Sequence, residues 1–301
     1  MTTDLLIAGG LSALVIAAVA STRQRRTVAN PSAVVATGLL IDDALKLARA
    51  RALTTAAAHG RPAPHLRLPW LDAPLGFLTG ELVPRGVAVD ILAAETERAR
   101  VELDAAFQAR GGPGVYPISR YRSFDEQAEI VRSVLGPQGI NASSDVPAIR
   151  RALLLSLQTR AIPGFSRHHW GTEVDVLSAD ADAWKPGGSA APYVQPLIAL
   201  APAYGLYHPY RDGAFPEPTR PHYAAEPWHL SLAAPAETLR QRWLREIGDD
   251  PMQYDALLRR AANAIASRVG ADPERVRQAL ASIDLRSYVR NVAPVPTELS
   301  A

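Results

Sequence analysis

The sequence predicts an α+β fold. A small, mainly antiparallel sheet carries the candidate site, helices flank the sheet, and a C-terminal helical appendage follows. Helical spacing of apolar residues dominates the chain between residues 87 and 159. Two later segments, 171–177 and 228–232, alternate between apolar and polar residues as strands do. After Pro235 the spacing is helical again. Helices followed by a few strands are typical of the α+β class, whereas a regular alternation of strands and helices would predict a parallel sheet.

Length and composition set the first limits on function. At 301 residues the chain can form one large domain or a medium domain with additions. Apolar residues make up 48% and charged residues 21%, as in an ordinary globular protein, and the formal charge of +2 disfavours a nucleic-acid partner. The chain has no cysteine, so disulfides and thiolate metal sites are excluded. Any metal site must therefore use histidine and carboxylate ligands.

The N-terminal segment predicts export. Leu5 to Ala20 is an uncharged apolar run, shorter than the about 20 residues of a spanning helix but long enough for a signal-peptide core. Its end, Ala18-Val19-Ala20, has the small-x-small form of a cleavage site. Arginines follow the run instead of preceding it. By the positive-inside rule this favours the orientation opposite to that of an exported chain. We expect residues 1–20 to be a signal peptide or a membrane anchor, with a buried N-terminal helix as the alternative.

The next segments lead to the candidate site. Residues 21–84 predict an Ala-rich amphipathic helix over Asp42–Ala58 and a proline-rich connector. A long helix is expected over Val87–Arg110, because a Gly-Gly-Pro-Gly run follows it. Val115–Ile118 is typical of a short strand.

Two further helices are expected before the strands that bear the site. Ser123–Leu135 has Ser123 as a possible N-cap and Glu126 at the capping-box position. The second helix covers Asn141–Thr159 and ends before the turn Ile162-Pro163-Gly164. Together with the strands, these elements define an expected site-bearing domain over residues 85–235.

Residues 236–301 predict the C-terminal helical segment. Helices are expected over Glu237–Ile247, Tyr254–Val269 and Asp272–Leu285. In the last of these, Asp272 is in the N-cap position and Pro273 in the first helical position. We expect this segment to pack on the preceding domain. No pattern in it indicates an oligomeric state.

The residues with the strongest chemical signal lie in two short segments, 166–175 and 226–229. They contain His168, Asp175 and His229, with Glu226 three residues before the last histidine. Two imidazoles and one carboxylate leave a fourth position for water, which is the composition of a catalytic zinc site, and Glu226 would be the general base. His168 and Asp175 are seven positions apart, an odd spacing that puts side chains of a regular strand on opposite faces, so Gly171 must allow a turn or bulge if both are to bind one ion. His229 is expected from a neighbouring strand.

These residues also carry a family resemblance. The run Ala161-Ile162-Pro163-Gly164-Phe165-Ser166-Arg167-His168-x-x-Gly171-x-x-x-Asp175, followed by Glu226-x-Trp228-His229, resembles the zinc D-alanyl-D-alanine carboxypeptidases of the VanY type. The same superfamily includes L,D-carboxypeptidases and peptidoglycan endopeptidases. Upstream, Tyr121-Arg122-Ser123-Phe124-Asp125-Glu126-Gln127 is similar to the family's Tyr-Arg-Ser-x-x-x-Gln element. The three motifs occur in the family order and span about half of the chain.

The resemblance implies a role for each matching residue. One zinc ion per chain would be bound by His168, Asp175 and His229, and Glu226 would be the catalytic base. Arg122 would act in catalysis and bind the substrate, at its terminal carboxylate or its polarised carbonyl, because a guanidinium matches a carboxylate. The further substrate-binding residues expected are Gln127, Ser166 and Trp228.

Three neighbouring residues depart from the motif or stand beside it. The family spacing selects His168 over the adjacent His169 as the ligand. Glu173 stands where the family usually has a small residue such as Ala. Its carboxylate could contact a metal ligand, face solvent or alter substrate preference, and all three are open. Arg167 is expected to face solvent.

The expected function is a zinc-dependent carboxypeptidase that hydrolyses the C-terminal D-Ala-D-Ala bond of peptidoglycan stem peptides. It would act in the cell envelope, with membrane contact only through the N-terminal segment. Within the same superfamily, an L,D-carboxypeptidase or an endopeptidase is the alternative. A non-catalytic peptidoglycan-binding module is a different class, and the intact Glu226 argues against it. A cytoplasmic dipeptidase is a further alternative if residues 5–20 do not export the chain.

Overall fold

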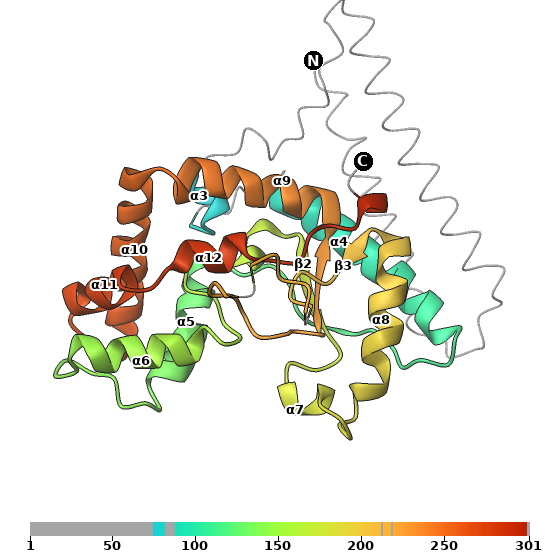
Figure 1. Ribbon diagram of the computed structural model, residues 1–301, viewed down its shortest axis with the longest axis horizontal. Coiled ribbons are helices and arrows are strands. Elements are labelled where there is room, and N and C mark those ends of the chain that lie inside the picture. Colours follow the sequence, from blue (N-terminus) through green and yellow to red (C-terminus); the bar gives the residue numbers. More distant parts are fainter. Residues whose placement is uncertain (1–74, 82–87, 212, 218, 300–301) are drawn as a thin grey trace, which may run out of the picture. The chain divides into compact units, whose positions relative to one another are not determined.

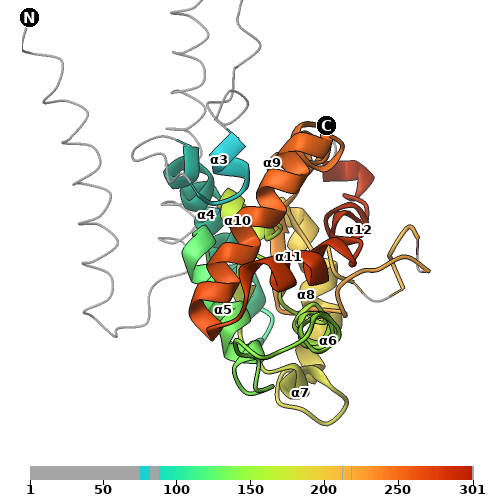
Figure 2. The ribbon, with the colours of Figure 1, turned by 90° about the vertical axis from the view of Figure 1, so that its left-hand side faces the viewer.

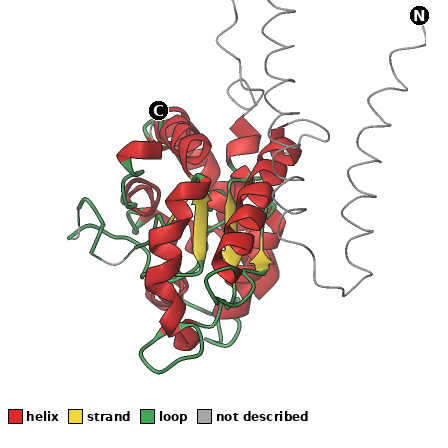
Figure 3. Ribbon diagram, turned by 90° about the vertical axis from the view of Figure 1, so that its right-hand side faces the viewer, coloured by secondary structure: helices red, strands yellow, loops and turns green. Residues whose placement is uncertain are grey.

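A four-stranded antiparallel sheet organises the fold, with the strand order β1-β2-β4-β3. Figure 3 shows the strands enclosed by helices. The α+β class with a small antiparallel sheet is therefore confirmed. The strands are short: β1 (Pro117–Ser119), β2 (Glu173–Val176), β3 (Leu206–Tyr207) and β4 (His229–Leu232).

The computed structural model describes residues 75–81, 88–211, 213–217 and 219–299, all within one compact unit, Arg67–Ala301. The expected export segment at residues 1–20 and the helix expected over residues 42–58 lie outside the described residues. Among the residues that are described, no helix has the length and apolar character needed to cross a membrane.

The two central strands give the sheet one apolar and one polar face. On β2, Val174 and Val176 lie in an apolar cluster, and Leu230 of β4 lies in the same cluster. Successive side chains of a strand point to opposite faces, so Asp175 and His229 point the other way. All of these side chains are buried, including the polar ones. The polar face is therefore an interior surface, where polar groups need partners.

Helices α4 (Ala88–Gln108) and α8 (Val194–Leu200) cover the apolar face. Leu103 and Phe107 of α4 and Leu197 of α8 are buried in the cluster with the strand residues. Figure 1 places α8 to the right of the sheet and the short α7 (Ala181–Trp184) below it. Residues Ala109 to Gly111 form the turn after α4, where the glycine-rich run begins.

A second and larger apolar core forms between helices from distant parts of the sequence. Helix α10 packs against α5, and α11 packs against α6, on the left of Figure 1 and facing the viewer in Figure 2. Arg268 of α10 also binds the Asp125 carboxylate of α5 at 2.8 Å. The C-terminal helices are thus built into the main core. The helices of this group are α5 (Phe124–Leu135), α6 (Val146–Ser156), α9 (Ala233–Trp243), α10 (Pro251–Val269), α11 (Pro273–Ala281) and α12 (Leu285–Arg290).

Local signals explain where several helices start. The capping box of Ser123 and Glu126 is present at the start of α5, as predicted. Helix α6 starts later than predicted, because the Asp145 side chain caps it. The helix expected over residues 272–285 ends earlier, at Ala281, and a further helix, α12, follows it with Asp284 as its N-cap. The remaining short elements are α3 (Leu75–Leu78), the 3-10 turns η1 (Arg167–Trp170), η2 (Ala191–Tyr193), η3 (Ala201–Tyr204) and η5 (Thr297–Leu299), and the π turn η4 (Leu244–Gly248).

Candidate active site

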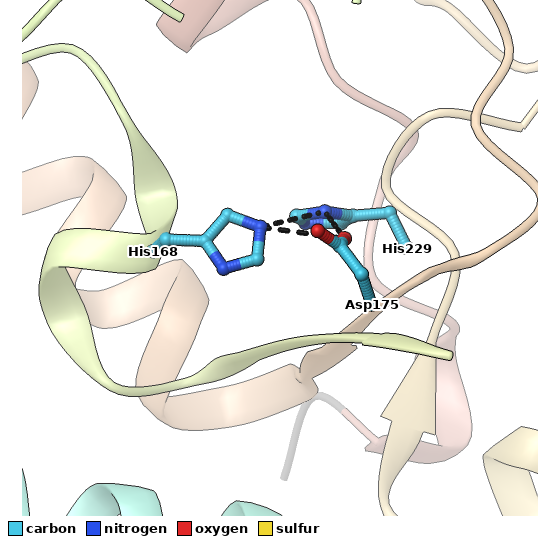
Figure 4. Close-up of side chains that lie close together, drawn as sticks. All are labelled: His168, Asp175 and His229. Atoms are coloured by element: carbon cyan, nitrogen blue, oxygen red, sulfur yellow. Dashed lines mark hydrogen bonds and ion pairs between the residues drawn. The ribbon is translucent and has the colours of Figure 1, made fainter. Parts of the chain in front are cut away.

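Three predicted ligands converge on the polar face of the sheet. His168 comes from η1, Asp175 from β2 and His229 from β4, and Figure 4 shows their side chains pointing toward one another. All three are buried, and one ligand atom of each lies within 4.8 Å of the others. His229 Nδ1 is 2.9 Å from Asp175 Oδ1 and 3.2 Å from His168 Nε2. Among the described residues, this is the group that can hold a metal ion.

The local fold explains how these side chains meet. Antiparallel pairing sets Asp175 directly opposite His229, so two ligands share one face of neighbouring strands. His168 lies before the strand, in η1, which ends at Gly171 in a left-handed conformation with φ 73°. Such a φ favours glycine, and it turns the chain from η1 into β2. The turn at Gly171 that the odd spacing requires is therefore present.

The nitrogen atoms on the outer side of both histidines are held by protein oxygens. His168 Nδ1 lies 2.7 Å from the Arg120 carbonyl oxygen and donates to it, which leaves Nε2 for a metal. His229 Nε2 lies 2.8 Å from the Glu173 carboxylate, which leaves Nδ1. Ligand histidines in metalloproteins are usually oriented by such contacts.

The donor set and its spacing fit zinc. Ligand atoms around a tetrahedral zinc are separated by about 3.3 Å, given zinc–nitrogen and zinc–oxygen distances of about 2 Å. The separations here are 2.9 Å, 3.2 Å and 3.4 Å. Two imidazoles and a carboxylate, with no thiolate, are also a usual catalytic zinc set.

Glu173 and Arg167 form a buried ion pair beneath His229. Their side chains are almost fully buried and lie 3.2 Å apart. Arg167 also donates to the hydroxyl oxygens of Ser231 at 2.6 Å and Tyr207 at 3.2 Å. The expectation that Arg167 faces solvent is wrong, because the Glu173 carboxylate on the interior face of β2 requires a cationic partner.

The pKa values of Glu173 and His229 are set by burial and by their charged partners. Burial would raise the pKa of Glu173, but Arg167 and His229 lower it to about 2. Burial would lower the pKa of His229, but hydrogen bonds to Asp175 and Glu173 raise it to about 9. Without a metal, His229 is therefore a cation held between two carboxylates. A bound metal cation would take the place of that proton.

Arg122 holds one of the ligands. Its Nη2 donates to Asp175 Oδ2 at 2.5 Å, and its Nε donates to Ser119 Oγ at 2.8 Å. The side chain stays 19% exposed and lines the cavity above the ligands. Arg122 thus contacts a carboxylate of the candidate metal group directly and keeps part of its side chain in the cavity.

Glu226 lies beside the ligand group but is not close enough to be part of it. Its Oε2 is 3.8 Å from His229 Nδ1, and the residue is 6% exposed. Its backbone N–H donates to the Tyr210 carbonyl at 3.0 Å, and its own carbonyl accepts from the His229 N–H at 3.0 Å. Burial raises the pKa of Glu226 to about 8, against the opposing effect of His229 and Arg122. A carboxyl with a pKa near neutrality suits proton transfer.

The other predicted substrate-binding residues take different positions. Ser166 and Trp228 line the same cavity as the ligands and Glu226. Gln127 does not belong to this lining. Its fully buried Nε2 donates instead to the Ala161 carbonyl at 2.7 Å, so it holds the segment that precedes Ser166.

His169 is a structural residue. Its Nδ1 lies 2.7 Å from the Arg122 carbonyl, and its Nε2 accepts from the Gly164 N–H at 3.0 Å. Burial lowers its pKa to about 3, so the ring is neutral. The two adjacent histidines thus fasten the segment at residues 120–122 over the site, and only His168 joins the ligand group.

The cavity also has lining residues that the motifs do not indicate. Tyr210 lies with its ring 4.8 Å from that of His229, and Tyr223 lies 5.0 Å from Tyr210. Both come from the long connection between the segments that carry Asp175 and His229, and long loops of this kind often carry binding residues. Arg160 also lines the cavity and had no sequence signal.

Several solved structures resemble part of this chain. DacB from Streptococcus pneumoniae D39 is 23% identical with a TM-score of 0.34, over 54% of this chain and 76% of its own. The LdcB LD-carboxypeptidase is 24% identical with a TM-score of 0.34, over 53% and 74%. A variant of the vancomycin-resistance D,D-pentapeptidase VanY in complex with Zn(II) is 21% identical with a TM-score of 0.32, over 49% and 77%.

A comparison with curated proteins found no match. In contrast, residues 88–234 match the family VanY, described as D-alanyl-D-alanine carboxypeptidase. The matched residues include the whole His168, Asp175 and His229 group and Glu226. The chain therefore belongs to the VanY family of D-alanyl-D-alanine carboxypeptidases, as a metallopeptidase whose family domain spans residues 88–234.

Proposed function

We propose that this peptidoglycan carboxypeptidase uses zinc to remove the C-terminal D-alanine from stem peptides that end in D-Ala-D-Ala. The family match supports the general activity. The observation that carries the proposal is the position of Glu226, which lies 3.8 Å from a ligand histidine and lines the same cavity as all three ligands. A base beside a metal group, in a cavity that admits a peptide end, supports hydrolysis over passive binding.

His168, Asp175 and His229 would hold one zinc ion. When bound, zinc supplies Lewis acidity for a carbonyl oxygen and lowers the pKa of water. The residues around it would maintain the shell. Arg120 and Glu173 orient the two imidazoles, and Arg122 holds the carboxylate.

Glu226 would move the proton. Its carboxylate would accept a proton from the water that attacks the carbonyl carbon, and would then give it to the nitrogen of the leaving D-alanine. Hydrolysis breaks the C–N bond and forms a C–O bond, so one proton must pass from water to the amine. The cationic groups of His229 and Arg122 favour the ionised form that starts this cycle.

The substrate would lie between Arg122, Ser166 and Trp228. The exposed part of Arg122 offers donors to a carbonyl or a carboxylate. Trp228 offers an apolar wall, with Trp184 behind it at 6.3 Å between ring centroids. Gln127 would contribute by fixing the Ala161 segment. Because the substrate is a cell-wall peptide, we place the activity in the cell envelope.

The test is mass spectrometry of the full-length, zinc-loaded protein incubated with a muropeptide ending in D-Ala-D-Ala. Loss of a single terminal alanine, absent in Glu226→Gln, is the expected result. Faster cleavage of tetrapeptide muropeptides than of this substrate would indicate an L,D-carboxypeptidase instead. Cleavage at an internal bond would indicate an endopeptidase. If no muropeptide is cut, the proposal fails in favour of a binding module.

A further inference from the structure

Three guanidinium groups line the catalytic cavity, and they differ in their partners. Arg122 binds the Asp175 carboxylate at 2.5 Å, and Arg167 binds the Glu173 carboxylate at 3.2 Å. Arg160 is exposed, and its side chain makes a weak hydrogen bond, 3.4 Å to the Thr159 hydroxyl. Within the described part of the chain, no carboxylate forms an ion pair with Arg160. One cation of the cavity is therefore available to a ligand.

The backbone beneath Arg160 is fixed. Its N–H donates to the Ser156 carbonyl at 2.9 Å, at the end of α6. The next carbonyl, that of Ala161, accepts from the buried Gln127 side chain at 2.7 Å. On the other side, the Ala224 N–H donates to the Gln158 carbonyl at 2.7 Å and ties the segment to the loop before Glu226. Because this backbone is held in place, the long Arg160 side chain reaches into the cavity from a fixed position.

Arg160 lines the same cavity as Glu226 and the three candidate ligands. Its exposure places it on the solvent side of that cavity, where a peptide enters. A guanidinium in this position selects for negative charge on the ligand.

We propose that Arg160 binds a carboxylate of the substrate peptide and thereby determines which peptides are cleaved. This inference rests on the proposed function. The carboxylate has two possible sources, the free C-terminus beyond the scissile bond and a free carboxylate on a residue upstream of it. Both present the same planar pair of oxygens to the guanidinium. Arg160 is a specificity residue, and it takes no part in proton transfer.

The test compares Arg160→Gln with wild type on three zinc-dependent reactions. The first probe is diacetyl-L-Lys-D-Ala-D-Ala, whose only carboxylate is its C-terminus. The second is L-Ala-γ-D-Glu-L-Lys-D-Ala-D-Ala, and the third is the same peptide with isoglutamine in place of γ-D-Glu. Arg151→Gln is the matched control, because Arg151 is an exposed arginine on α6 outside the cavity.

The expected result is a KM about 10- to 100-fold higher in Arg160→Gln, with kcat unchanged, as for the loss of one charge-assisted contact. A rise with all three probes assigns the C-terminal carboxylate. A rise confined to the γ-D-Glu peptide assigns the upstream carboxylate. Arg151→Gln should match wild type throughout. Equal KM values for wild type and Arg160→Gln on every probe would overturn the inference.

The result remains decisive if wild type cleaves none of the probes, which would instead reject the proposed function. In that case the same three peptides are titrated against the zinc-loaded proteins by calorimetry. Weaker binding in Arg160→Gln, with Arg151→Gln unchanged, would support carboxylate recognition without turnover. Equal affinity in all three proteins, or binding by none of them, would overturn it.

Discussion

The Nε2 atom of His229 lies 2.8 Å from Oε2 of Glu173, so a buried carboxylate fixes the orientation of a histidine of the candidate metal group. The other oxygen of Glu173 accepts from Ser231 Oγ at 2.8 Å and from Thr172 Oγ1 at 2.9 Å. Arg167 neutralises the carboxylate from below at 3.2 Å. These contacts leave Glu173 without freedom to move, and the imidazole is held with it.

Replacing Glu173 by Gln should weaken zinc binding by about 10- to 100-fold, because a neutral amide orients and polarises the imidazole less than a carboxylate does. The affinity is measured by competition with a chromophoric chelator at fixed pH. Glu274→Gln is the control, since Glu274 is an exposed, ion-paired carboxylate on α11 and should leave the affinity unchanged. An affinity for Glu173→Gln equal to that of wild type would show that the contact does not support the metal.

Replacing Arg167 by Met should lower the free energy of unfolding by about 3–5 kcal/mol, the usual result of leaving one member of a buried ion pair alone. Arg167 and Glu173 are at most 1% exposed at their side chains, so water cannot replace the lost partner. Urea unfolding of the metal-free protein gives the value. Arg132→Met removes an exposed ion pair on α5 and should change stability little. A comparably small effect of Arg167→Met would contradict the buried-pair interpretation.

The stability of the metal-free protein should fall as pH rises from 7 to 8, above the pH range in which buried neutral histidines such as His169 act in the opposite direction. The folded-state pKa of Glu226 is about 8, above its ordinary value of 4.5, because burial favours the neutral carboxyl. The contribution of the Glu226 carboxyl to the free energy of unfolding is fully present below pH 4.5 and is lost as the pH rises through about 8. His229, with its pKa raised to about 9 from 6.5 by its carboxylate partners, acts in the same direction.

Glu226→Gln isolates the carboxyl in this pH dependence. The variant keeps the size of the side chain and cannot ionise, so its unfolding midpoint should decline less steeply between pH 7 and pH 8. The slope attributable to one group is at most about 1.4 kcal/mol per pH unit. Thermal unfolding with chelator present at each pH provides the comparison. Parallel curves for wild type and Glu226→Gln would place the titration elsewhere.

The sequence predicts local features better than buried electrostatics. The capping box at Ser123 depends only on residues three apart, and it is present. The three candidate ligands are predicted because their types and order are specific to one kind of chemistry, and the structure brings their side chains together. The sequence places Arg167 in solvent wrongly, because the carboxylate that binds it lies six residues away on a strand whose two faces are both interior. A charged residue on a half-polar strand normally indicates an exposed face.

Long-range packing was the other limit of prediction. The C-terminal helices were expected as an appendage that packs on the catalytic domain. Their apolar residues, such as Leu257 and Leu280, share one core with Leu153 of α6. Helical periodicity identifies a buried face but not the element that covers it. The same limit applies to Arg160, whose place in the cavity depends on how the end of α6 meets the loop before Glu226.

The left-handed conformation of Gly171 predicts a variant that separates metal binding from general strain. Gly171 has φ 73° and joins η1, which carries His168, to β2, which carries Asp175. Alanine at this φ costs about 1–2 kcal/mol, and any relaxation of the turn moves one ligand relative to the other. Gly171→Ala should therefore lose both stability and zinc affinity.

Gly139→Ala is the matched control for Gly171→Ala. Gly139 has φ 72°, and a Cβ atom there would meet nothing within 4 Å, so the backbone strain is nearly the same without a steric clash. It lies in the loop between α5 and α6, away from the ligands. Urea unfolding should give similar losses for the two variants, and chelator competition should give weaker zinc binding for Gly171→Ala alone. If both variants bind zinc as tightly as wild type, the turn at Gly171 serves the fold and not the spacing of the ligands.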